Sequence, residues 1–155
     1  MTRVELAVPV EVGVPAAVLW RSVTDWEHQG EWMLATTVRR TGGDGRSPGS
    51  TWSAATGVGP LAVVDTIELV ELVEGGPWRA TVRHTGKVVR GDGIFTVEAL
   101  GPARSRFTVA EHLDLPGGLL GLACRSAVRT VGWLGLEVSL RRLARRVEAE
   151  HAARA

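Results

Sequence analysis

Three ionisable residues occupy positions where apolar side chains are expected. Asp65 lies in the run LAVVDTIELVELV, His84 lies in WRATVRH, and Glu111 lies in RFTVAEHLDL. Each run is mostly apolar at every second position, and the three residues fall on these positions, so all three are expected to face the same side of a sheet. Ionisable groups on an apolar surface can orient a ligand or transfer protons. Burial there shifts their pKa values, in directions that depend on the neighbouring groups.

Each of these residues also fits a purely structural role. His84 adjoins the turn Thr85-Gly86 and could lie at the rim of the sheet, Asp65 could accept backbone hydrogen bonds, and Glu111 could pair with Arg90. A shift of one residue in strand register would turn all three side chains outward. The three positions are too far apart for their spacing to indicate a metal site. The sequence also has no Ser-His-Asp order, phosphate-binding glycine loop or nucleotide fingerprint.

The hydrophobic pattern predicts the elements that would position these residues. Residues 3–12 alternate as an amphipathic strand, and Pro15 precedes the short helical run AAVLWRSV. A second short helix is expected in TDWEHQGEW. Six more strand-like runs follow, at 34–41, 51–57, 61–73, 78–84, 87–100 and 106–115. Because the connections between them are too short for crossovers, the predicted sheet is antiparallel.

The end of the chain changes to a helical period. Trp133, Leu136, Leu140, Leu143 and Val147 recur at spacings of three and four. They predict one helix of about 30 residues with a broad apolar face. A sheet with one solvated face must cover the other, and only this helix is large enough. The predicted fold class is therefore α+β: a curled antiparallel sheet of about seven strands around a long C-terminal helix, with two short helices after the first strand.

Glycines interrupt this predicted helix at Gly121, Gly132 and Gly135. Each costs on the order of 1 kcal/mol of helix stability relative to alanine. Two explanations remain open: the glycines allow a close approach of the sheet, or they leave room for a ligand.

The stretch TDWEHQGEW holds two of the six tryptophans. Thr24 and Glu27 form a capping-box pattern for the second short helix. We expect Trp26 to pack against the end of the sheet and Trp32 to lie at the mouth of a cavity, where a contact with ligand is a hypothesis. His28 is expected at the surface.

Composition limits the remaining classes of function. The 155 residues fit a single domain spanning 1–155, and 45% hydrophobic with 23% charged residues is typical of a globular protein. The net charge of +1 makes nucleic acid a poor candidate partner. Cys124 is the single cysteine, so neither an internal disulfide nor a cysteine zinc site is expected, and no metal or cofactor is predicted. The first residues do not resemble a signal peptide and no apolar run is long enough for a membrane span, so a cytoplasmic location is expected.

The segments TDWEHQGEWM, TGVGPLAVVDT, HTGKVVRGDGIF and EHLDLPGGLLG, in this order of elements, resemble the SRPBCC or START-like superfamily. Within it, the chain is most similar to polyketide cyclase/dehydrase-like proteins. The resemblance covers nearly the whole chain. It implies a helix-grip fold with an apolar cavity between the curled sheet and the C-terminal helix. Because the superfamily includes lipid carriers, hormone receptors and aromatase/cyclases, it implies a cavity but no particular reaction.

These expectations lead to two main hypotheses of function. The first is a protein that binds or carries a small hydrophobic molecule such as a lipid; the second is an aromatase/cyclase-like enzyme that uses acid and base groups in the cavity. Paired ionisable groups in the cavity would favour the enzyme, and an entirely apolar lining would favour the carrier. A third hypothesis, an interaction module using the arginine-rich helix end, predicts a helix packed too tightly to leave a cavity. A homodimer remains open. The candidate ligand-binding residues are Trp32, Trp52, Asp65, His84, Phe95, Glu111, Val131, Gly132 and Gly135.

Overall fold

The computed structural model describes residues 2–115 and 117–155, with the backbone alone described for 2 and 119–124. The surroundings expected for Gly121 therefore lie outside the described residues. In chain order the elements are β1 (Thr2–Val12), α1 (Ala16–Val23), the 3-10 helix η1 (Trp26–Glu31), β2 (Thr36–Gly42), β3 (Thr51–Thr56), the 3-10 helix η2 (Gly59–Leu61), β4 (Val63–Val73), β5 (Trp78–Thr85), β6 (Arg90–Gly101), β7 (Arg104–Leu115) and α2 (Leu119–Arg154).

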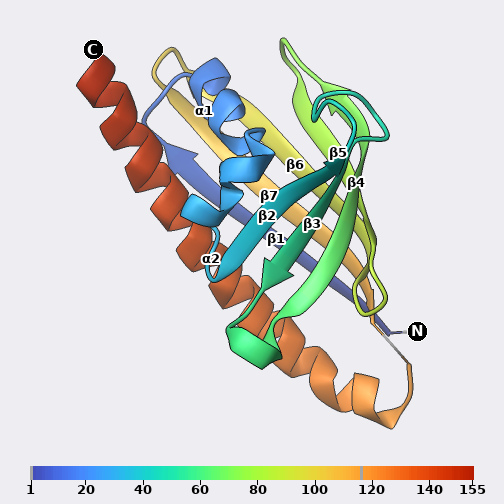
Figure 1. Ribbon diagram of the computed structural model, residues 1–155. Helices are drawn as coiled ribbons and strands as arrows, with labels where there is room; N and C mark the ends of the chain where they lie inside the picture. The colour runs from blue at the N-terminus through green and yellow to red at the C-terminus, as the bar shows by residue number, and fades with distance from the viewer. Residues whose placement is uncertain (1, 116) are drawn as a thin grey trace.

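The strands form one sheet in the order β1-β7-β6-β5-β4-β3-β2, and all neighbours are antiparallel. Strands β2 to β7 follow one another as a meander, whereas β1 pairs with β7 from the other end of the chain. Figure 1 shows the sheet curling beside α2, with α1 and η1 lying over the sheet. The predicted α+β helix-grip fold is confirmed.

Alternation along the strands decides which side chains face the concave side. Phe107 and Val109 of β7 are fully buried, and Leu69 of β4 and Val82 of β5 are at most 2% exposed. These residues belong to the apolar sets that the sequence pattern placed inward. The same register carries Asp65, His84 and Glu111 to the concave side.

The long helix α2 is buried unevenly along its length. In its second half Leu140, Leu143 and Val147 are at most 3% exposed, whereas in its first half Val131 is 69% and Leu134 51% exposed. Among its described residues, the helix therefore buries large apolar side chains in the core in its second half, whereas those of the first half are largely exposed. Among the described residues, no helix is both long enough and apolar enough to span a membrane.

Two local predictions are wrong. The capping box does not form, because the Thr24 hydroxyl donates to the carbonyl of Trp20 at 2.7 Å and Glu27 forms an ion pair with Arg40. The second short helix is accordingly a 3-10 helix without a side-chain cap. A strand was expected from residue 61 onward, but Leu61 lies in η2 and is 84% exposed, since β4 begins only at Val63.

Candidate functional site

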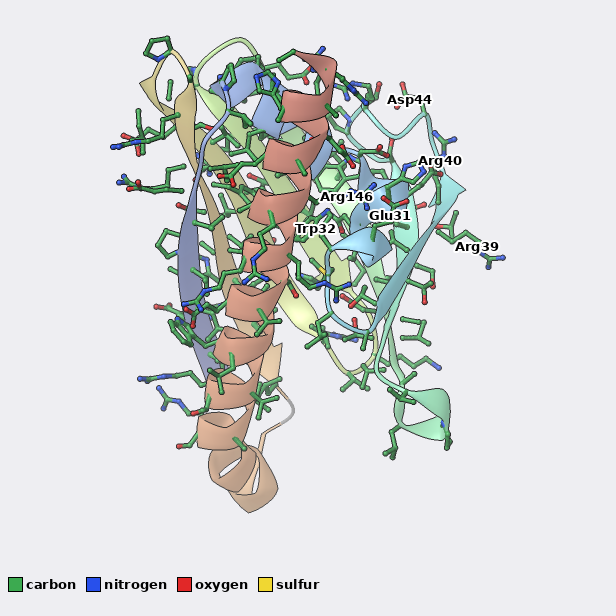
Figure 2. All side chains as sticks on the ribbon, turned by 90° about the vertical axis from the view of Figure 1, so that its left-hand side faces the viewer. Glu31, Trp32, Arg39, Arg40, Asp44 and Arg146 are labelled. Carbon is green, nitrogen blue, oxygen red and sulfur yellow. The ribbon has the colours of Figure 1, made fainter. Side chains whose placement is uncertain are left out.

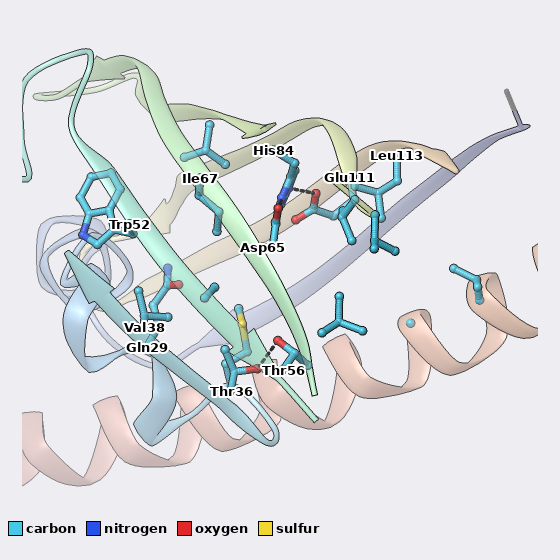
Figure 3. Close-up of a pocket in the computed structure, with 18 of the residues that line it drawn as sticks. Gln29, Thr36, Val38, Trp52, Thr56, Asp65, Ile67, His84, Glu111 and Leu113 are labelled. Carbon is cyan, nitrogen blue, oxygen red and sulfur yellow. Dashed lines mark hydrogen bonds and ion pairs between the residues drawn. The ribbon is translucent and has the colours of Figure 1, made fainter. Parts of the chain in front are cut away.

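A cavity of about 690 Å³ lies between the concave face of the sheet and the first half of α2 (Figure 3). Val63, Val88 and Val131 line it and are 41%, 52% and 69% exposed, so the cavity opens to solvent beside them. The volume falls in the range of roughly 300–1,000 Å³ that is usual for small-molecule sites. The third hypothesis, which required a helix too tightly packed for a cavity, is therefore wrong on this point.

Aromatic rings form the inner part of the lining. Trp26 of η1 packs against Trp52 of β3 and Phe95 of β6, with ring centroids 5.5 and 5.6 Å apart. The indole N–H groups of Trp26 and Trp52 are buried without a hydrogen-bond partner among the described residues. The lining of this end therefore consists of aromatic rings, together with two buried N–H donors.

An ionisable cluster stands on the opposite part of the wall, where β4, β5 and β7 bring Asp65, His84 and Glu111 together (Figure 3). His84 Nδ1 lies 2.5 Å from Asp65 Oδ2, and His84 Nε2 lies 2.9 Å from Glu111 Oε2. Their side chains are only 11–13% exposed. We call these three residues the carboxylate–histidine cluster. The suggested pairing of Glu111 with Arg90 is wrong, because the imidazole of His84 lies between the two carboxylates.

The cluster holds His84 in its charged form. Burial lowers the pKa of His84, but the hydrogen bonds to Asp65 and Glu111 and the negative charges of these carboxylates raise it further, to about 10. The ring is therefore protonated at neutral pH, and both of its N–H groups donate to carboxylates. An imidazolium held in this way has no free nitrogen with which to accept a proton from a ligand.

Two glycines make room for the carboxylates. A Cβ atom at Gly93, which is paired with Glu111 across β6 and β7, would lie 3.1 and 3.2 Å from the two oxygens of Glu111 and 2.9 Å from Val82 Cγ2. A Cβ atom at Gly86 would lie 2.5 Å from Asp65 Oδ1. This role of the two glycines was missed from the sequence. The sequence carries no local signal for it, because Gly93 comes to lie opposite Glu111 only when β6 and β7 pair.

A second polar group on the wall was also missed. Gln29 is 5% exposed and lines the cavity, and its amide has no hydrogen-bond partner among the described residues (Figure 3). Nearby, the hydroxyls of Thr36 and Thr56 lie 3.0 Å apart. Gln29 follows Trp26 by three residues, and residues three apart share one face of a 3-10 helix, which is the signal that could have found it.

The structure places most of the predicted ligand-binding residues on the cavity wall. These are Trp52, Asp65, His84, Phe95, Glu111, Val131 and Gly132. Gly132 combines both of the proposed glycine roles, because it lines the cavity and a Cβ atom there would lie 3.2 Å from Leu6 Cδ1 of β1. Contact of any of these residues with a ligand stays a prediction.

Trp32 and Gly135 lie elsewhere, and their predicted places need correction. Trp32 is 3% exposed and packs edge-on against Phe107, beside the Glu31–Arg146 ion pair that joins η1 to α2 (Figure 2). It follows the end of η1, so it points toward the helix while Trp26 points into the cavity. At Gly135 an added Cβ would meet no atom within 4 Å, so it faces open space rather than sheet or cavity.

The histidine of the TDWEHQGEW segment lies outside the cavity. His28 is exposed and hydrogen-bonds Asp25 at 2.8 Å, and this contact raises the pKa of His28. Among the residues that the structure describes, no group of three or more His, Cys, Asp or Glu side chains is arranged to hold a metal ion.

Structures of other proteins share this fold. A protein of Thermus thermophilus is 16% identical with a TM-score of 0.80, covering 95% of this chain and 99% of its own. The Zhui aromatase/cyclase of Streptomyces sp. R1128 is 14% identical with a TM-score of 0.78, at 95% and 94% coverage. A START superfamily protein of Mycobacterium smegmatis is 17% identical with a TM-score of 0.75, at 94% and 97% coverage.

The sequence itself identifies the family. No curated protein matches the chain. The family model described as polyketide cyclase / dehydrase and lipid transport matches residues 1–148, nearly the full length. The resemblance seen in the sequence segments is thereby confirmed, and the chain belongs to the polyketide cyclase / dehydrase and lipid transport family.

Proposed function

We propose that the protein binds a small, largely apolar molecule between the sheet and α2, as a binding or carrier protein. The observation that carries this proposal is the cavity of about 690 Å³, with its aromatic inner end and its apolar mouth. A ligand that fills such a space removes apolar surface from water, which contributes roughly 25 cal/mol per Å². Membership of a family that includes lipid transport is in keeping with this role.

The carboxylate–histidine cluster bears on the choice between carriage and catalysis. Both nitrogens of His84 are engaged, at 2.5 and 2.9 Å, and its pKa of about 10 keeps the ring protonated at neutral pH. A general base works best when its pKa lies near the working pH. His84 is therefore suited to holding two carboxylates in place rather than to removing a proton.

A second candidate function is a cyclase-like enzyme. It is favoured by one observation, the presence of ionisable groups within hydrogen-bond distance of one another on the cavity wall. In that case Glu111 is the candidate base, since His84 has no free nitrogen. The two functions differ in what happens to the bound molecule, because a carrier releases it chemically unchanged, whereas a cyclase releases a ring-closed product. Chromatography coupled to mass spectrometry, applied to a ligand co-purified from the native host before and after incubation with the protein, distinguishes them, since an isomeric product of equal mass still elutes separately.

Binding is tested with a matched pair of variants on β3. Ala54 is buried and lines the cavity, whereas its neighbour Ala55 does not line it, and successive strand residues face opposite sides. Ala54→Phe would fill part of the cavity, and Ala55→Phe adds the same side chain on the other face. The neutral dye N-phenyl-1-naphthylamine should bind the wild type and quench Trp26 and Trp52, which line the cavity.

We expect Ala54→Phe to weaken dye binding at least about tenfold, because phenylalanine occupies ligand space, while Ala55→Phe binds as the wild type does. Thermal melts check that both variants are folded. If the wild type does not bind the dye, or if both variants bind it equally well, the cavity is not a ligand site and the proposal is wrong.

A further inference from the structure

The charged groups on the cavity wall give it a net negative charge. The chain has 18 Lys and Arg residues, yet none of them lines the cavity among the described residues. The ionisable groups on its wall are Asp65, His84 and Glu111. With both carboxyls ionised, the cluster carries a net charge of −1 when His84 is protonated and −2 when it is neutral. The wall is therefore negative in either state of the histidine.

One oxygen of the cluster remains available to a ligand. Asp65 Oδ2 and Glu111 Oε2 contact His84, and Asp65 Oδ1 is buried against Gly86. Glu111 Oε1 accepts no hydrogen bond from the described residues and, unlike Asp65 Oδ1, is not sealed from the cavity (Figure 3). Carboxylate oxygens only accept hydrogen bonds. The cluster thus presents an acceptor and no donor to the cavity.

The other polar groups on the wall cannot offset this charge. Gln29, Thr36 and Thr56 are neutral, although they supply both donors and acceptors. The indole N–H groups of Trp26 and Trp52, buried without a partner among the described residues, are neutral donors as well. An anionic head group in the cavity would lose its hydration and meet the negative cluster without a cation to pair with. Burial of an unpaired charge is strongly unfavourable.

We propose that the cavity selects its ligand by the polar group: it takes apolar molecules whose neutral or cationic group donates a hydrogen bond to Glu111, and it excludes apolar anions such as fatty-acid carboxylates. This inference rests on the proposed function and names the class of ligand for the same cavity. It opposes the simplest expectation for a lipid-binding protein, that a fatty acid would serve as a ligand.

The test uses three molecules with the same ten-carbon chain as competitors for bound N-phenyl-1-naphthylamine. Decanol has a neutral donor, decylamine has a cationic donor, and decanoate is an anion. We expect decanol and decylamine to displace the dye from the wild type at concentrations at least about tenfold lower than decanoate, in keeping with the strength of charge interactions in a partly buried site.

Variants separate the effect of the cluster from the greater water solubility of decanoate. Glu111→Gln removes one negative charge while leaving Asp65 and His84 paired, so decanoate should bind about tenfold more tightly and decanol should change less than about twofold. Asp65→Asn removes the charge of a carboxylate whose two oxygens lie against His84 and Gly86, and a smaller gain of about threefold in decanoate binding is expected. Glu98→Gln is the control: it also replaces a glutamate by glutamine, but on β6 at a side chain that is 65% exposed. It should alter the binding of neither decanoate nor decanol.

The possible outcomes bear on the inference and on the proposed function separately. The inference is overturned if decanoate binds the wild type as tightly as decanol does, or if Glu111→Gln does not increase its affinity. The proposed function is unaffected by either result, because it depends on binding of the dye. If Glu111→Gln does not fold, Asp65→Asn decides by the same criterion. If neither the dye nor decanol binds the wild type, the proposed function fails and the inference fails with it.

Discussion

The two halves of α2 face the same sheet, but one half closes a core and the other borders a cavity. Leu140, Leu143 and Val147 of the second half are buried in the core. The first half places Ala127, Val128, Val131 and Gly132 on the cavity wall. The core residues of the second half include leucines, whereas no described residue of α2 on the cavity wall is larger than valine. One continuous helix thus borders a packed core along one half and an open cavity along the other.

The largest expected effect comes from opening the packed half. Leu140 is 1% exposed, so Leu140→Ala should lower the free energy of unfolding by about 2–5 kcal/mol through lost burial and a new cavity. Val131→Ala, at a residue that is 69% exposed beside the cavity mouth, should cost less than about 0.5 kcal/mol. Urea unfolding measures both. Similar losses at the two positions would show that the two halves of the helix do not differ in packing.

A pH-dependent effect is expected at the cavity, where the charge of His84 in the carboxylate–histidine cluster contributes to stability. The pKa of His84 is raised from 6.5 to about 10 in the folded state, so this contribution is fully present below 6.5 and is lost as the pH rises through about 10. The difference in unfolding free energy between the wild type and His84→Gln should therefore shrink steadily as the pH rises across that interval. Denaturant unfolding at several pH values measures it. A difference that does not vary with pH would contradict the raised pKa.

The smallest effect distinguishes the two helix glycines. Gly135→Ala places its Cβ in open space and should raise the unfolding free energy by about 0.5–1 kcal/mol, the usual gain in helix propensity. At Gly132 the same change meets Leu6 Cδ1 at 3.2 Å, so most of this gain should be lost. Thermal melts compare the two variants. An equal gain at both would mean that Gly132 is not needed for the approach of α2 to β1.

The sequence could predict the concave face because strand alternation is a local property. Asp65, His84 and Glu111 each lie in a run whose every second residue is mostly apolar, and this pattern was enough to place their side chains on the inward face. Their mutual contacts could not be predicted, because these depend on how separate strands align. Ile67 lies opposite His84, and Gly93 lies opposite Glu111, only once the sheet has formed.

Elsewhere the local pattern was insufficient. Trp32 was expected at the mouth of the cavity, but Trp26 is the tryptophan of this segment that lines the cavity. The turn of the short 3-10 helix decides which of the two rings faces the cavity, and the sequence pattern does not show it. The periodicity of α2 identified its apolar face. It could not show that this face meets the core at Leu140 and the cavity at Val131, because that depends on the side chains of other elements.

The pairing of β1 with β7 has a consequence for how the chain folds. Thr2 pairs with Leu115, whereas each of β2 to β6 pairs with the strand that follows it in the chain. During synthesis at roughly 5–20 residues per second, β1 must wait for its partner for several seconds or longer. The six-stranded meander can form from hairpins alone, but β1 and α2 join it by contacts between distant parts of the chain, which are slow to form. We therefore expect closure of the cavity to be a late event in folding, because it requires α2, which follows β7 in the chain.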